Sequence, residues 1–221
     1  MFKRAVLSTV ACVLLGTIPA TASTIDIGLA QSPGIGSITT EATGTSSSGA
    51  IWAGSYGGYV FNLISASGSL NSASVNVSLP SLFGGGGSIY VYVTETGLTS
   101  PQSTLGFLSN LSVTSLPAGW SETETTYVDT TNQAYGMGTQ LASMSGLGTQ
   151  SFFTNVNVGS SPFSLTEMYL ISSTGSLGVA SSSESISATP LPGAIPLFAS
   201  GLGALGLLGW FRKRKATALA A

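Results

Sequence analysis

The chain has 221 residues, with eight acidic and six basic side chains, no histidine and a single cysteine, Cys12. All six basic residues lie at its ends, Lys3 and Arg4 at one end and residues 212–215 at the other. The long middle therefore lacks the bases of Ser–His, Ser–Lys and Cys–His nucleophile systems. It also lacks the ligands of zinc, copper or haem sites and the cations that bind nucleic acid, so no cofactor and no nucleic acid partner is predicted.

Residues 1–22 have the pattern of a cleavable signal peptide. A basic pair precedes an apolar run over residues 5–18, and Ala20 and Ala22 supply the small residues that signal peptidase requires. A helix over that run would be only about 21 Å long, short of a bilayer core of ~30 Å. We therefore predict cleavage between Ala22 and Ser23, which also removes the cysteine.

The segment 23–188 is predicted to be an exported β domain. Apolar residues recur there with period two, and glycine and proline interrupt the pattern at short intervals. This favours a single antiparallel β-sandwich, jelly-roll-like, with about eight to ten strands. The clearest strands are expected at residues 23–29, 59–65, 74–79, 89–95, 107–113, 125–129, 152–158, 163–171 and 184–188.

The core of this domain is expected to supply most of its stability. The domain has no basic residue and no cysteine, so neither side-chain ion pairs nor disulfides contribute. Large side chains predicted to be buried include Trp52, Phe61, Leu63, Tyr90, Phe107, Trp120, Phe152 and Phe163.

Three acidic residues form the first candidate site. Glu122 and Glu124 share one face if their segment is extended, and Asp129 follows shortly after them. Their oxygens could bind calcium, or the two glutamates could serve as the carboxylates of a glycoside hydrolase. The interpretation we favour is a solvated acidic strand edge, with no metal and no catalytic residue.

Surface aromatic residues form the second candidate site. Trp52 and Trp120 could stack on sugar rings, which would make the domain a carbohydrate-binding module. Aromatic residues of a sandwich more often pack in its core or across strands, so core packing is the favoured interpretation.

The last part of the chain has three segments. Residues 189–194, Thr-Pro-Leu-Pro-Gly-Ala, are followed by an apolar run over 195–211 and a basic cluster over 212–215, with 216–221 as a short cytoplasmic tail. The prolines favour an extended segment outside any sheet, and seventeen apolar residues make a transmembrane helix of about 25 Å. The stop-transfer residues, Arg212, Lys213, Arg214 and Lys215, should stay in the cytoplasm.

This tail resembles the PEP-CTERM sorting signal, in its VPLPA variant, found on exported proteins of Gram-negative bacteria that make extracellular polysaccharide. The motif residues are Thr189, Pro190, Leu191, Pro192, Gly193 and Ala194, with threonine in place of the usual valine and glycine in place of the first alanine. The resemblance implies recognition by an exosortase, a membrane-embedded cysteine protease, and a cut near Pro192.

The sequence therefore predicts a non-enzymatic protein of the cell surface or extracellular matrix. Its expected partners are signal peptidase, an exosortase, the membrane through the transient helix, and extracellular polysaccharide. The domain would first lie in the periplasm, anchored in the inner membrane, and finally at the cell surface or outside the cell. The alternatives are a carbohydrate-binding module and a surface protein that keeps its membrane anchor.

Overall fold

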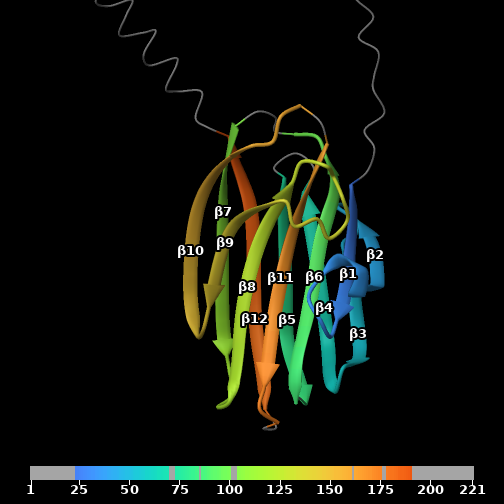
Figure 1. Cartoon of the computed structure of the whole chain (residues 1–221), viewed down its shortest axis with the longest axis vertical. Helices are drawn as coiled ribbons and strands as arrows, with labels where there is room; N and C mark the ends of the chain where they lie inside the picture. The colour runs from blue at the N-terminus through green and yellow to red at the C-terminus, as the bar shows by residue number, and fades with distance from the viewer. Residues whose placement is uncertain are drawn as a thin grey trace, which may run out of the picture.

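The computed structural model describes residues 23–69, 73–84, 86–100, 104–160, 162–175 and 178–190, without the side chains of Pro80 and Pro190. These residues form two antiparallel six-stranded sheets that face each other (Figure 1). The expectation of a single all-β antiparallel sandwich is confirmed. The predicted signal peptide, residues 191–194 of the sorting motif, the apolar run and the basic cluster lie outside the described residues.

Each sheet combines strands that are distant in sequence. Sheet A has, in spatial order, β2 (Thr39–Thr45), β1 (Thr24–Ala30), β6 (Gly87–Leu98), β11 (Phe163–Ser173), β8 (Trp120–Asp129) and β9 (Thr139–Ser145). Sheet B has β10 (Gly148–Asn157), β7 (Thr104–Ser115), β12 (Val179–Pro190), β5 (Ser74–Gly84), β4 (Tyr59–Ser69) and β3 (Ala50–Tyr56). A short 3₁₀ turn, η1 (Ile35–Ser37), is the one helical element among the described residues.

Alternation along the strands builds the core between the sheets. In β7 the side chains of Leu105, Phe107, Leu111 and Val113 are buried, whereas the residues between them are mostly polar. Phe107 meets Phe163 of sheet A edge-on, with ring centroids 6.5 Å apart. The sandwich thus buries one face of each sheet and leaves much of the other to polar side chains.

The described part of the chain has twelve strands rather than about eight to ten. The unexpected strands are β2, β3 and β9, which lie at or beside the sheet edges. The sequence of β2, TTEATGT, contains few apolar residues because an edge strand buries little of its surface, and the sequence of β3, AIWAGSY, does not alternate between apolar and polar residues. Periodicity therefore underestimates strands of this kind.

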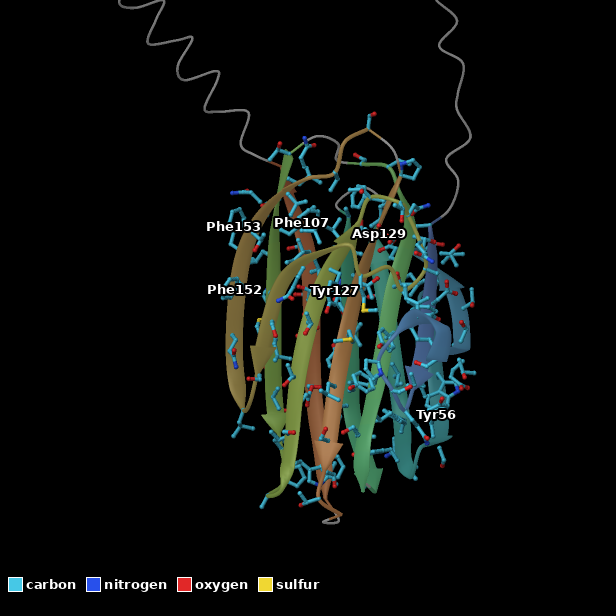
Figure 2. All side chains as sticks on the ribbon, viewed as in Figure 1. Tyr56, Phe107, Tyr127, Asp129, Phe152 and Phe153 are labelled. Atoms are coloured by element: carbon cyan, nitrogen blue, oxygen red, sulfur yellow. The ribbon has the colours of Figure 1, made fainter. Side chains whose placement is uncertain are left out.

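Part of the predicted core is exposed instead. Phe152 on the edge strand β10 is 54% exposed and Leu63 is 37% exposed, whereas Tyr90 lies half-buried on the outer side of sheet A. Phe152 was misassigned because β10 has no neighbouring strand on its far side, and Leu63 lies between two register shifts of the β4–β5 pairing. Figure 2 shows Phe152 and Phe153 along the outer side of β10.

The beginning of β1 and the end of β12 lie at the same end of the sandwich (Figure 1). β12 continues through Thr189 and Pro190, which pair with Gly106 and Leu105 of β7. The strand therefore runs two residues into the predicted sorting motif, and the expectation that the prolines lie outside any sheet is wrong at Pro190. Among the described residues, no helix has the length and hydropathy needed to cross a membrane.

Candidate functional site

Four glutamates project into the space between the two sheets. Glu122 and Glu124 come from β8, Glu167 from β11 and Glu184 from β12, and none is more than 4% exposed. We call them the interior carboxyl cluster. Glutamate is seldom fully buried unless it is paired, so four such residues in one core are unusual.

The strand register explains how the cluster forms. β8 and β11 are neighbours in sheet A, where Glu124 lies opposite Tyr169 and Thr126 lies opposite Glu167. Glu184 enters from sheet B, between Val77 and Leu111. The prediction that Glu122 and Glu124 share a face is confirmed. The prediction of a solvated acidic strand edge is wrong, because β8 lies between β11 and β9 and sheet B covers this face.

The carboxyl oxygens of the cluster have no hydrogen-bond partner among the described residues, and neither does the buried hydroxyl of Tyr169. Ser182 and the backbone of Ile186 lie near Glu122 and Glu167, respectively, without reaching hydrogen-bond geometry. One polar bridge does cross the interior nearby, between the hydroxyls of Ser109 and Thr126 at 3.0 Å. The interior is therefore polar, but the carboxyl groups themselves are unpaired.

Burial changes the ionisation of these groups. It raises the pKa of Glu122, and it raises the pKa of Glu167 well above its usual range, with a further contribution from the charge of Glu95. Burial also raises the pKa of Glu184 well above its usual range, and the charge of Glu122 adds to this. The domain contains no lysine, arginine or histidine that could offset this effect, so burial favours the protonated form of these three carboxyl groups.

Glu95 on β6 is a fifth buried glutamate, at the end of the sandwich where the described chain begins. The hydroxyl of Ser23 donates a hydrogen bond to its Oε1 at 2.5 Å, and its Oε2 has no partner among the described residues. Burial raises the pKa of Glu95 to about 7, although the hydrogen bond from Ser23 acts in the opposite direction.

The predicted calcium ligands are not brought together. Asp129 belongs to the other face of β8, where its carboxylate accepts hydrogen bonds from the hydroxyl of Thr131 at 2.7 Å and from the backbone N–H groups of Thr131 and Gln133. Burial pushes the pKa of Asp129 upward, but these hydrogen bonds outweigh it and lower the pKa. Asp129 thus organises a turn, and no group of three acidic residues within the described ranges could hold a metal ion.

The two glutamates offered as hydrolase carboxylates are also inaccessible. Glu122 is 1% exposed and Glu124 is fully buried, so a glycan cannot contact either of them in this structure. A glycosidase needs its acid and its nucleophile or base on both sides of a bound glycosidic bond. The geometry of β8 does not provide such a site.

Neither predicted tryptophan presents a free ring face. Trp120 is 7% exposed and meets Tyr59 edge-on, with ring centroids 5.7 Å apart. Trp52 is half-buried on β3 and packs against Phe61 at 5.5 Å. The sugar-stacking hypothesis for these two residues is therefore not supported by their positions, which are those of core and core-margin side chains.

A shallow groove of about 320 Å³ lies on the outer face of sheet B, and the sequence alone did not indicate it. Its polar lining comes from four neighbouring strands: Asn76, Asn110, Ser112, Thr149, Ser183 and Ser185. Asn110 donates to the Ser185 hydroxyl at 3.3 Å and accepts from the Ser151 hydroxyl at 2.7 Å. Glu184 borders the groove, but its buried carboxyl group belongs to the interior, so the exposed lining is uncharged.

The interior carboxyl cluster could have been found from residue parity. Glu167 occupies the same alternate positions as Leu165, Tyr169 and Ile171, all of which are buried. An acidic residue on the apolar side of a strand signals a buried carboxyl group. The groove carries no such signal, since it depends on which strands become neighbours.

Comparison with known proteins gives only a distant likeness of fold. No protein-family model and no curated protein matches the chain. A solved structure of infectious bursal disease virus, Gx strain, is 14% identical, with a TM-score of 0.38, over 84% of this chain and 54% of that chain. A VP2 subviral particle of the same virus is 12% identical, with a TM-score of 0.34, over 78% and 53%. The chain spans about half the length of these structures.

Proposed function

We propose that this protein is an exported, non-enzymatic component of the cell surface or extracellular matrix, built on a jelly-roll-like sandwich. Signal peptidase would remove residues 1–22, and an exosortase would act on the motif that begins at Thr189. The basic residues at both ends would orient the two apolar segments in the membrane. The two cleavages would then remove these residues together with the apolar segments. The remaining domain would be acidic and rich in serine and threonine.

The position of the two ends supports this proposal. The first residue of β1 and the last residue of β12 lie at one end of the sandwich, so a leader and a tail in the same membrane would leave the domain upright on that end (Figure 1). The opposite end and both outer faces would then point away from the membrane.

The last two residues of β12 belong to the predicted exosortase motif and are paired with β7. Pro190 pairs with Leu105, and the Thr189 hydroxyl donates to the backbone oxygen of Gly106 at 3.0 Å. A protease that binds the motif at Pro190 in its active site must first separate Thr189 and Pro190 from β7. Cleavage is therefore expected to be slower in the folded domain than in a peptide that contains the motif.

Intact mass of the exported form tests the proposal. The expected species begins at Ser23 and ends near Pro192, and trypsin should not cut it even in denaturant, because no lysine or arginine remains. A species that retains its end at Ala221 and stays in the inner membrane would refute processing and support a permanent anchor.

The outer groove favours a second candidate function, the binding of neutral polysaccharide. Its amide and hydroxyl groups are the partners that sugar hydroxyls need, and its volume is at the lower end of the range for ligand sites. Exposed Phe153 lies on the same face beside Gly106, close to one end of the groove. An uncharged lining on an acidic domain predicts a preference for neutral over anionic chains.

Binding to neutral and anionic polysaccharides, measured by affinity electrophoresis, tests this candidate. Asn110→Ala should weaken binding to a neutral chain at least several-fold. Gln140→Ala is the matched control, because this exposed amide belongs to β9 of the other sheet. Equal mobility of both variants and the wild type would reject the groove as a polysaccharide site.

A further inference from the structure

Ser23, the residue that directly follows the predicted signal peptidase cut, is already part of the folded domain. It is fully buried, and its hydroxyl donates to Glu95 at 2.5 Å. Its backbone oxygen accepts a hydrogen bond from the N–H of Ser46 at 3.3 Å. Ser23 is thus held from two sides before the first strand begins.

Among the residues that the structure describes, none that could carry a positive side chain surrounds Glu95. Next to it in sheet A are Ile25 of β1 and Leu165 of β11, and across the interior it meets Gly68 of β4, where a Cβ atom would lie no more than 2.8 Å from either carboxyl oxygen. The other titratable group that acts on this region is Glu167, which is also acidic. Within the described ranges, Glu95 therefore has one hydrogen-bond donor, Ser23, and one buried oxygen without a partner.

Cleavage after Ala22 would place a new charge beside this carboxyl group. Hydrolysis adds one water across the peptide bond: Ala22 leaves with a carboxylate, and the nitrogen of Ser23 becomes an amine that takes up a proton. A free α-amino group has a pKa of about 7.7–8.0, so it is largely cationic at neutral pH. Because the nitrogen and Oγ of one serine are about 3 Å apart, the ammonium would lie within about 6 Å of Glu95, close enough to favour its ionised form.

We propose that removal of the leader creates an ion pair between the α-ammonium group of Ser23 and Glu95, which fastens β1 to β6 and makes the stability of the domain depend on processing. This inference rests on the proposed cleavage after Ala22. The ammonium would be the only cation of the processed domain, since no lysine, arginine or histidine lies between Arg4 and Arg212. It would replace the uncompensated carboxyl group of the uncleaved chain with a charged pair.

The pH dependence distinguishes the two forms. In the uncleaved or N-terminally blocked chain, buried Glu95 keeps its proton up to a pH of about 7, whereas in the unfolded chain it ionises near pH 4.3. The free energy of unfolding therefore falls as the pH rises from about 4.3 to about 7. In the processed chain the ammonium group stabilises the ionised carboxylate, so the free energy of unfolding falls less over the same pH range. The difference between the forms should be small at pH 5, largest near pH 7.5, and reduced again above about pH 9, where the amine loses its proton.

The test compares the processed exported protein with the same protein acetylated at its α-amino group. N-terminal sequencing first establishes whether the chain begins at Ser23. The protein is then acetylated in denaturant and refolded beside a mock-treated sample. We expect the free amine form to melt about 3–6 °C higher at pH 7.5 and within about 1 °C at pH 5. In Glu95→Gln, acetylation should have no effect at either pH.

A second readout needs no variant. The paired, buried amine of the native protein should react with an acetylating reagent at least tenfold more slowly than the same amine in denaturant. Equal melting temperatures of the free and acetylated forms at pH 7.5, or an unprotected amine, would overturn the proposal.

If sequencing finds another start, the proposed cleavage site is wrong. A protein that starts at Ser23 after removal of a fusion partner then tests the ion pair alone. A melting difference in that protein supports the ion pair, and its absence rejects it.

Discussion

The interior carboxyl cluster predicts that the domain is more stable in acid than at neutral pH. Glu167 and Glu184 have pKa values well above the usual range because they are buried. In the unfolded chain, glutamates ionise near pH 4.3. Glu95, with a pKa of about 7, behaves in the same way, so between pH 5 and 6 the folded state binds about three more protons than the unfolded state. The free energy of unfolding therefore falls as pH rises.

The magnitude follows from proton linkage. Each proton retained only by the folded state costs 1.36 kcal/mol of stability per pH unit, so three such groups cost up to about 4 kcal/mol between pH 5 and 6. Small domains have total stabilities of about 5–15 kcal/mol, so the effect is a large fraction of the whole. Glu122 has a raised pKa and acts in the same direction.

Urea denaturation at constant ionic strength, at half-unit steps from pH 4.5 to 7.5, measures this slope. Glu167→Gln and Glu184→Gln should each remove about a third of it, because the amide cannot ionise, and each variant should exceed the wild type in stability at pH 7. Glu41→Gln is the matched control, because Glu41 belongs to the edge strand β2 and lies outside the interior carboxyl cluster. A stability that is constant or rises between pH 5 and 7 would refute the protonated core.

Substitutions at four further positions test the packing. Gly68→Ala should destabilise the domain by about 1–3 kcal/mol in urea titration, because a methyl group there collides with Glu95; an unchanged midpoint would show that this contact can relax. Asp129→Ala should cost about 1–3 kcal/mol by leaving donors of its turn unpaired, and Asp129→Asn should cost less. Trp120→Ala should cost about 3–5 kcal/mol by thermal melting, whereas Phe152→Ala on β10 should stay within about 0.5 kcal/mol; equal losses would contradict the burial assigned to them.

The central strands of the fold could be predicted from the sequence because each buries one full face. Clear alternation marks β5, β6 and β11, where large apolar residues such as Val75, Val91 and Leu165 recur at every second position. Alternation does not predict the edge strands β2, β3 and β9, because their half-exposed positions accept serine, threonine and glycine.

For the candidate sites, the sequence predicts which side chains share a strand face but not whether that face is buried. That Glu122 and Glu124 share a face follows from the two-residue period of a strand and needs no tertiary information. Whether that face meets water or a second sheet depends on the neighbours of β8, which are β11 and β9. The same is true of Trp120, whose ring is covered by Tyr59 from sheet B.

The sequence by itself determined the distribution of charge: every basic residue lies in a terminal segment, and the domain between them has only acidic ones. Only the tertiary structure decided what this means for the core. Strand pairing brings carboxyl groups from β8, β11 and β12 into one interior, and it sets Ser23 against Glu95 across 72 residues of chain. The physical reason is that composition fixes which charges exist, whereas burial, which depends on distant neighbours, fixes whether they can stay ionised.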